Sequence, residues 1–342
     1  MSRFLAYVRR FRRYLPYLKF IFVCSIFFLA VRALHAILKN YNWKQLTSYI
    51  HQLPPAQIAA AAVLSLIAYF VTTGYDSVAF RHIDHDLHYG RIALAAFTAY
   101  AINNNLGMSG VVGSSLRYRF YRRWGVMATD IVKIFVFCTV TFYLGFAMLG
   151  GLVFLFWPPV TASEFHLPFG SVRIFGAVLL IPALAYSGWI LIRQAPLRLR
   201  RWRIEIPTRS IFVAQLIIAM GDWFIAAAVL RIVLPPSHPV PYATLLGTFF
   251  MAQVAGLASN VPGGLGVFEA VVLVSLKPFL SPVVIIGALV TFRGVYFLLP
   301  LAIALLLLGG HELWMRVRPR QEVGRPEPLR QHDDRAEKHD EE

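Results

Sequence analysis

The chain has 342 residues, of which 58% are hydrophobic and only 15% charged, with a mean hydropathy of +0.60 and a formal net charge of +16. The basic residues cluster between long apolar segments, which is typical of a membrane protein and argues against nucleic acid as the partner of the positive charge. Cys24 and Cys138 both lie inside apolar segments, so the sequence offers neither a disulfide framework nor a cysteine metal site.

A basic segment at residues 1–16 precedes a single predicted transmembrane domain at residues 17–315 and a mixed-charge tail at residues 316–342, which is predicted to be disordered. Six segments of the domain reach the roughly 20 residues that a spanning helix needs. They are Tyr17–Leu38, Pro55–Tyr75, Thr129–Trp157, Val172–Ile192, Ser210–Leu234 and Val283–Gly310. The first has no signal-peptide cleavage site, so we expect it to remain as an anchor.

Two shorter apolar stretches, Ile92–Ile102 and Tyr242–Leu257, lie between the predicted spans. The Arg-rich loop Arg198–Arg209 is predicted to be cytoplasmic, and the loop Trp157–Gly170, which contains no Lys or Arg, is predicted to be external. If both short stretches crossed the membrane, both loops would lie on the wrong side. We therefore predict that each stretch enters the membrane, breaks and returns as a re-entrant hairpin, with eight full spans as the alternative.

The order span, hairpin, span occurs twice, in units at about residues 55–157 and 210–310. The first unit starts outside and the second inside, so the two are inverted relative to each other. Such inverted repeats are typical of transporters that alternate access to a central site. The predicted fold class is an all-α polytopic membrane protein with both termini cytoplasmic.

A glycine-broken sequence follows each short stretch, and the two sequences share their glycine spacing. The residues that mark them are Gly110, Gly113 and Arg117 in the first, and Pro262, Gly263, Gly266 and Glu269 in the second. A lipid-facing backbone cannot leave its N–H and C=O groups unpaired. Such breaks therefore predict a protein-lined transport site near the membrane midplane.

The charges that follow the two breaks have opposite signs. Glu269 complements the positive end of the half-helix that it opens. Arg117 stands at the unfavourable end of its half-helix, so it requires an anion, which is either a protein carboxylate or a ligand phosphate. Ser114 and Ser115 are the expected caps of that half-helix.

Further polar residues extend this predicted site. The amides of Asn103, Asn104 and Asn105 are expected to line a cavity beside the first break. Arg293 and Lys133 fall early in the matching third spans, where each is expected to pair with a carboxylate or to line a headgroup path.

Two acidic residues, Asp76 and Asp222, lie in or beside predicted spans. Charges at membrane depth are costly and normally face a partner, so we expect structural salt bridges, for example with Arg81, Lys133 or Arg231. Proton coupling is the alternative role for Asp222.

One loop, His82–His88, carries a dense cluster of His and Asp. Such a cluster is a candidate metal site or catalytic base, which leaves a membrane-embedded transferase as a further hypothesis. Nothing at matching spacing completes a metal site, so we interpret the loop as a solvated connector and predict no metal or cofactor. The absence of a Walker A sequence argues against transport driven by ATP hydrolysis in this chain.

The segment from Gly110 to Gly125 resembles the first signature of the lysylphosphatidylglycerol synthase transmembrane family, and Pro262–Ala270, followed by Arg293, resembles the second. The resemblance implies a flippase-like inner-membrane domain, because the membrane region of the full-length synthases moves aminoacylated phosphatidylglycerol to the outer leaflet. We expect this chain to lack the aminoacyl-transferase domain that follows this region in the synthases. We therefore expect no enzymatic transfer of lysine.

The sequence thus predicts a translocase of the bacterial inner membrane for an anionic or aminoacylated phospholipid or a lipid-linked glycan. Its headgroup is predicted to enter between the hairpins, where Arg117 binds the phosphate and Glu269, Arg293 and the asparagines form the path. The alternative is a non-transporting scaffold for a separate lipid-modifying enzyme. The predicted partners are the lipid, such an enzyme and a second copy of this chain.

Overall fold

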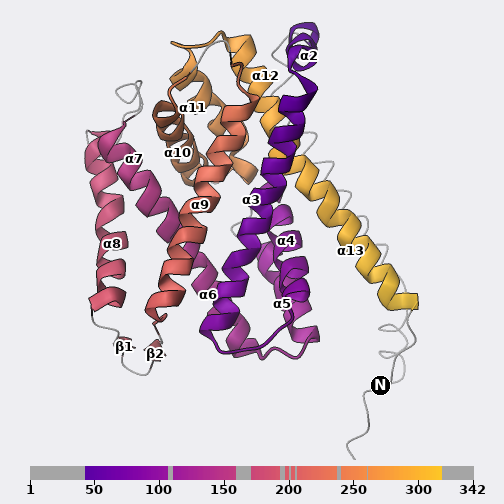
Figure 1. Cartoon of the computed structure of the whole chain (residues 1–342), viewed down its shortest axis with the longest axis vertical. Helices are drawn as coiled ribbons and strands as arrows, with labels where there is room; N and C mark the ends of the chain where they lie inside the picture. Colours follow the sequence, from indigo (N-terminus) through magenta and orange to yellow (C-terminus); the bar gives the residue numbers. More distant parts are fainter. Residues whose placement is uncertain are drawn as a thin grey trace, which may run out of the picture.

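The computed structural model describes residues 43–106, 111–158, 171–192, 197–199, 202–204, 206–236, 240–259 and 261–317. The predictions for the N-terminal segment, the first span, Gly110 and nearly all of the tail fall outside these residues. Figure 1 shows long helices that run side by side along the length of the molecule.

Apart from turns and loops, the described part of the chain is helical except for one short two-stranded ribbon. The helices are α2 (Trp43–Gln52), α3 (Pro55–His82), α4 (Tyr89–Leu106), α5 (Val111–Arg123), α6 (Ala128–Gly145), α7 (Gly151–Phe156), α8 (Val172–Ile192), α9 (Arg209–Val233), α10 (Tyr242–Ala258), α11 (Val267–Leu276), α12 (Pro282–Phe292) and α13 (Leu299–Val317). Strands β1 (Leu197–Leu199) and β2 (Trp202–Ile204) pair antiparallel before α9, where the sequence predicted only an Arg-rich loop. The predicted all-helical class is confirmed, and the ribbon is a short connection between α8 and α9.

Five helical segments of the described residues are long and apolar enough to cross a membrane. They are Pro55–His82, Ala128–Phe156, Val172–Ile192, Arg209–Ile232 and Pro282–His311. Five of the six predicted spans are thereby confirmed, with boundaries that differ by a few residues. The protein is a multi-pass membrane protein.

The two longest of these segments each contain a π-helical turn. The turn η1 (Phe146–Gly150) joins α6 to α7, and the turn η4 (Arg293–Leu298) joins α12 to α13. A π turn inserts one extra residue per turn and rotates the side chains that follow it, and such turns occur often at functional sites.

Helices α3 and α9 pack against each other along the centre of the molecule (Figure 1). Glycine permits their close approach, because a Cβ on Gly74 would lie 3.0 Å from the side chain of Ile218. Helix α6 approaches the other side of α9 even more closely, since a Cβ on Gly145 would lie 2.6 Å from the backbone of Ala219. Helix α9 is thus held on two sides by helix contacts that larger residues would prevent.

Two pairs of shorter helices form hairpins, α4 with α5 and α10 with α11. The α4–α5 pair lies in the lower half of Figure 1 and the α10–α11 pair in the upper half. Gly113 lets α5 lie against α4, because a Cβ there would be 2.9 Å from the carbonyl oxygen of Ala99. The end of α4 contacts η3 (Pro262–Gly264), the turn that opens the second break, so the tips of the two hairpins meet.

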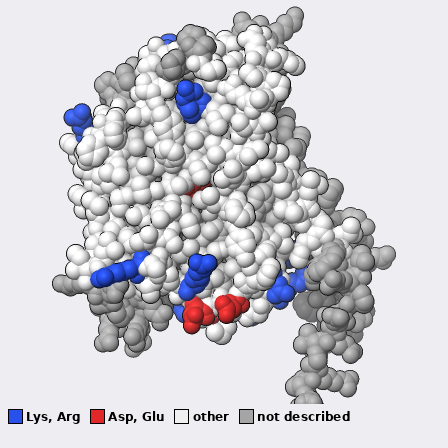
Figure 2. Space-filling view, viewed as in Figure 1, with Lys and Arg blue, Asp and Glu red and all other residues white. Residues whose placement is uncertain are grey.

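Charged side chains on the face shown in Figure 2 gather toward its two ends, and the wide belt between them is almost wholly uncharged. Exposed apolar side chains, among them Ile67 and Phe70 on α3, Ile181 on α8 and Ile217 on α9, lie on the spanning helices. Such a surface is suited to contact with lipid chains, which is consistent with the five candidate spans.

Candidate functional site

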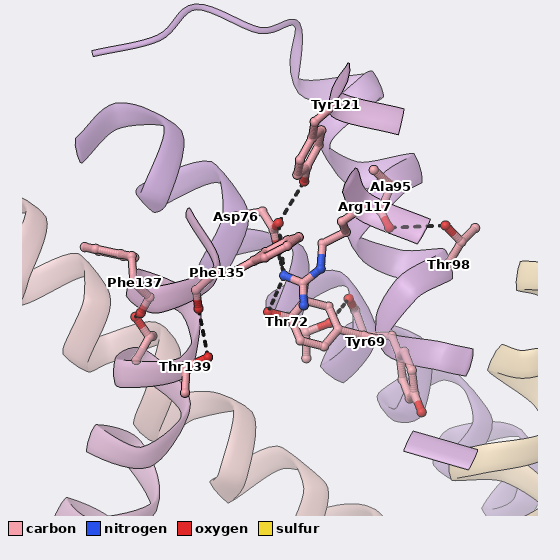
Figure 3. A network of polar contacts seen from close by, with 12 residues as sticks. Tyr69, Thr72, Asp76, Ala95, Thr98, Arg117, Tyr121, Phe135, Phe137 and Thr139 are labelled. Atoms are coloured by element: carbon pink, nitrogen blue, oxygen red, sulfur yellow. Dashed lines mark hydrogen bonds and ion pairs between the residues drawn. The ribbon is translucent and has the colours of Figure 1, made fainter. Parts of the chain in front are cut away.

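A buried ion pair joins the first hairpin to α3. The Arg117 guanidinium nitrogen Nη1 lies 3.1 Å from Oδ2 and 3.2 Å from Oδ1 of Asp76 (Figure 3). Asp76 is fully buried, and the Arg117 side chain is 11% exposed. An ion pair removed from water in this way is stabilising only when both partners remain, because either charge left alone would be strongly unfavourable.

Aromatic side chains surround this pair. The Tyr121 hydroxyl donates a 2.7 Å hydrogen bond to Asp76 Oδ1, and the Arg117 guanidinium lies over the rings of Tyr100, at 4.7 Å, and Phe135, at 5.3 Å. The guanidinium is not saturated, because Arg117 Nε is buried and has no hydrogen-bond partner. One donor of the cation therefore remains available to a further acceptor.

The anion that Arg117 requires is thus a protein carboxylate in this structure. The structural salt bridge predicted for Asp76 is observed, but its partner is Arg117 and not Arg81, Lys133 or Arg231, which were named from the sequence as examples. The physical reason lies in the start of α5. This helix begins at Val111, before Gly113, so Arg117 lies in its second turn and reaches across to α3.

The early start of α5 also corrects the predicted caps. Ser114 and Ser115 lie inside the helix, and therefore neither occupies the N-cap position. Gly113 likewise does not break the helix; it allows the close contact with α4.

A second buried ion pair lies at the second break. Arg293 Nε donates a 2.6 Å hydrogen bond to Glu269 Oε1, and Arg293 Nη1 donates a 2.9 Å bond to the carbonyl oxygen of Gly263. Glu269 Oε2 accepts from the backbone N–H of Gly266 at 2.7 Å, at the start of α11. The expected role of Glu269 at the helix N-terminus is therefore observed, and Arg293 pairs with a carboxylate.

The backbone at this break is one that only glycine adopts readily. Gly263, Gly264 and Gly266 have φ values of +62°, +61° and +83°. Side chains with a Cβ are strained at such angles, so the sequence Pro-Gly-Gly-Leu-Gly permits the turn between α10 and α11.

The three asparagines lie at the end of α4, beside this turn. A Cβ on Gly263 would be 3.6 Å from the carbonyl oxygens of both Asn104 and Asn105. Asn104 Nδ2 donates to the Tyr69 hydroxyl at 3.2 Å, and Asn105 Nδ2 donates to the Phe297 carbonyl at 3.1 Å. Two of the predicted amides thus hold neighbouring helices.

The third amide differs from the other two. Asn103 Oδ1 is buried and has no hydrogen-bond partner. Buried polar atoms are nearly always paired in folded proteins, so this amide oxygen is an exception among the three asparagines.

Asp222 on α9 forms none of the predicted salt bridges. It is 7% exposed, and its Oδ2 accepts a 2.8 Å hydrogen bond from the Tyr75 hydroxyl on α3. Its other oxygen, Oδ1, is buried without a partner, and no cation pairs with it in the described parts of the chain. Arg81, Lys133 and Arg231 were therefore wrong as partners here too.

Lys133 lies outside the buried clusters. Its Nζ is 3.2 Å from Oδ1 of Asp130, one turn earlier on α6, and its side chain is 58% exposed. The carboxylate partner was expected for Lys133, but the pair is at the surface rather than beside the hairpins.

The His82–His88 loop shows no metal-site geometry. Across the residues that the structure describes, no group of three or more His, Cys, Asp or Glu side chains could hold a metal ion. Two of its histidines pack against aromatic rings, His82 against Phe137 and His85 against Phe80.

Sequence reasoning missed the tyrosines that connect these clusters. The structure places Tyr69, Tyr75, Tyr100 and Tyr121 against the charged and amide side chains. A signal did exist for two of them, because Tyr75 precedes Asp76 and Tyr121 follows Arg117 by four residues, which puts it on the same helix face.

Comparison with known proteins places the chain in a family. The family model described as the lysylphosphatidylglycerol synthase TM region matches residues 17–304. Protein slr0712 of Synechocystis is 34% identical over 301 residues, which cover 87% of this chain and 92% of that protein. The inner membrane protein YbhN of Escherichia coli is 28% identical over 284 residues, 82% of this chain and 88% of YbhN.

Full-length lysyltransferases match over their membrane region alone. The phosphatidylglycerol lysyltransferase of Staphylococcus haemolyticus is 25% identical over 303 residues, which are 86% of this chain but 34% of that enzyme. The chain therefore spans about a third of the length of these enzymes. By its sequence match over almost the whole membrane domain, this chain belongs to the lysylphosphatidylglycerol synthase TM region family.

Proposed function

We propose that the protein is a lipid translocase, or flippase, of the bacterial inner membrane. Its cargo would be an anionic or aminoacylated phospholipid or a lipid-linked glycan. The observation that carries the proposal is the meeting of two helical hairpins beside two buried ion pairs, Asp76–Arg117 and Glu269–Arg293. Buried charges between spanning helices are expensive, and they normally mark a pathway for a polar group.

The packing of the helices supports an inverted repeat. Helix α3 contacts η4 of the second unit, and its counterpart α9 contacts η1 of the first. In the same way, α4 contacts α13 and α10 contacts α7. In both cases a contact made by one unit is repeated by the matching elements of the other unit, as expected for two units related by a pseudo-twofold axis. The placement of the hairpins in opposite halves of Figure 1 supports the re-entrant interpretation.

The headgroup chemistry follows from the polar atoms left open. Arg117 Nε and Asn103 Oδ1 lack hydrogen-bond partners, so they offer one donor and one acceptor near the first hairpin. A phosphate oxygen can accept from the guanidinium while an ammonium group, where the lipid carries one, donates to the amide. The acyl chains would remain in the bilayer beside the exposed apolar helix faces.

When the Asp76–Arg117 pair opens for a lipid, neither charge needs to remain without a partner. A phosphate can replace Asp76 at Arg117, and the ammonium of an aminoacyl headgroup can replace Arg117 at Asp76. Because both protein charges remain paired during this exchange, the cost of separating a buried ion pair is avoided. A headgroup that carries both charges suits the site better than a simple anion.

Lipid translocation in proteoliposomes tests this proposal. Headgroup-labelled phosphatidylglycerol and aminoacyl-phosphatidylglycerol are compared for the wild type, Arg117→Lys and Glu269→Gln, with Lys133→Gln at the exposed pair as the matched control. We expect the two site variants to lose roughly tenfold or more in rate, since a lost charge-assisted hydrogen bond is worth about 1.5–3 kcal/mol. The control should translocate at the wild-type rate.

The protein must remain folded for the comparison to be valid, so each variant is checked for a single gel-filtration peak and for wild-type helix content. If folded wild-type protein moves none of the lipids, the translocase proposal is wrong. The scaffold for a lipid-modifying enzyme would then be the better explanation, and it is tested by co-purification with enzymes of that class.

A further inference from the structure

Asp222 is a buried acid that the site described above does not use. It lies near the middle of α9, a candidate membrane span, and is 7% exposed. One carboxyl oxygen accepts from Tyr75, and the other has no partner. An ionised carboxylate with an unpaired oxygen is among the least favourable groups at such a place.

Among the residues that the structure describes, no positively charged side chain pairs with Asp222. Tyr69 and Tyr75 on α3 and Tyr296 on η4 are the titratable groups that interact with it electrostatically. Three other elements that pack on α9 contain no charged residue; they are α10, α12 and η1. The Asp130 and Lys133 side chains of α6 pair with each other at the surface, and Arg173 of α8 is exposed.

We propose that Oδ1 of Asp222 binds a proton during the transport cycle and that binding and release of this proton couple lipid movement to a proton gradient. The proposal rests on the proposed translocase function. A proton fits the site because a single oxygen suffices to bind it and because it removes the net charge. A sodium ion would require several oxygen ligands, whereas one tyrosine hydroxyl is the hydrogen-bond partner found for this carboxylate among the described residues.

A physical route connects Asp222 to the first ion pair. Tyr75, its hydrogen-bond partner, is the neighbour in sequence of Asp76, which holds Arg117. The ring of Tyr75 also contacts the ring of Tyr100 edge-on at 5.9 Å, and the Tyr100 ring lies under the Arg117 guanidinium.

Protonation of Asp222 would weaken the hydrogen bond from Tyr75, because the bond then no longer ends on a charged oxygen. This bond ties α3 to α9, so its weakening would loosen the contact between the first spans of the two repeat units. Asp76 lies on the same helix α3 and would move with it, whereas Arg117 lies on α5. Proton binding would thereby bias the opening of the pair toward a lipid headgroup.

Infrared spectroscopy tests the proton site without reference to transport. A protonated carboxyl has a C=O stretching band separate from that of a carboxylate. We expect the wild type to show a band that grows as the pH is lowered, that is absent in Asp222→Asn and that is retained in the surface control Asp130→Asn. Tyr75→Phe, which keeps the ring and removes the donor, should shift the band to higher frequency. A band unchanged in Asp222→Asn and Tyr75→Phe would overturn the assignment.

Proteoliposomes with a gradient of one pH unit test the coupling. If one proton moves with each lipid, the gradient sustains a leaflet asymmetry of up to about tenfold, and reversal of the gradient reverses the asymmetry. Asp222→Asn should reach the same distribution with and without the gradient, while Asp130→Asn should behave as the wild type.

The two proposals fail in different ways. Wild-type protein that moves lipid but ignores the pH gradient, or that responds to a sodium gradient alone, overturns proton coupling and leaves the translocase intact. Wild-type protein that moves no lipid overturns the translocase and the coupling together, and the infrared band then decides proton binding separately.

Discussion

The substitution Asp76→Ala is expected to be the most destabilising polar change in the first hairpin. It removes a fully buried carboxylate and leaves the Arg117 guanidinium, whose side chain is 11% exposed, without an anion. Breaking a buried pair by removal of one partner costs about 3–5 kcal/mol, because the remaining charge stays desolvated. Asp76→Ala also removes the acceptor of the Tyr121 hydroxyl, so the loss should lie at the upper end of that range.

Two single substitutions provide a scale for this loss. Tyr121→Phe removes one hydrogen bond to the same carboxylate, which should cost about 1.5–3 kcal/mol. Lys133→Ala breaks the pair with Asp130, in which the lysine is 58% exposed, and pairs with a solvent-exposed partner contribute about 0–1 kcal/mol. The expected order of stability loss is therefore Asp76→Ala, then Tyr121→Phe, then Lys133→Ala.

The double variant Asp76→Leu with Arg117→Met distinguishes the stability contribution of the whole ion pair from the cost of leaving one charge alone. It replaces two charges by apolar side chains of similar size, which should cost much less than the sum of Asp76→Ala and Arg117→Ala. Unfolding in mixed micelles with increasing sodium dodecyl sulfate, followed by tryptophan fluorescence, gives each free energy. Single losses that simply add, or equal losses for Asp76→Ala and Lys133→Ala, would refute the buried pair.

Three further outcomes are expected. Gly263→Ala should destabilise the protein by about 1–2 kcal/mol in the same unfolding assay, because φ is +62° there. Gly309→Ala on α13 should be neutral or slightly stabilising, because a Cβ at this position would have no neighbour within 4 Å beyond its own helix. In a background without the native cysteines, Asp86→Cys and Pro236→Cys should react with a membrane-impermeant thiol reagent from opposite sides; reaction from the same side would favour eight full spans. His85→Ala should leave lipid translocation unchanged, and a loss of translocation with wild-type helix content would revive a role for the His82–His88 loop.

Local features of this protein could be read from the sequence because they depend on neighbouring residues. Five spans followed from the length of the apolar segments, since a helix must cross about 30 Å of hydrocarbon. The turn at Gly263 and Gly266 followed from the glycines, and the position of Glu269 at the start of α11 followed from its distance to that turn. The spans depend on the composition of a continuous segment, and the position of Glu269 depends on residues within one helical turn.

The partners of the buried charges were decided by tertiary structure alone. The sequence named Arg81, Lys133 and Arg231 as examples of partners for Asp76 and left the anion for Arg117 open, and the observed pair joins Asp76 to Arg117, 41 residues away. That choice depends on where α5 begins and on how it is rotated against α3, and a shift of one residue would turn the guanidinium by about 100°.

Tertiary packing also determines that Oδ1 of Asp222 lacks a hydrogen-bond partner. Glycines at positions 74 and 145 bring α3 and α6 close against α9, and this packing places Tyr75, rather than a cation, beside the carboxylate. The apolar pattern of a chain fixes which segments enter the membrane, because burial in lipid depends on composition. Which polar side chains meet there depends on helix rotation and close packing, which only the assembled bundle determines.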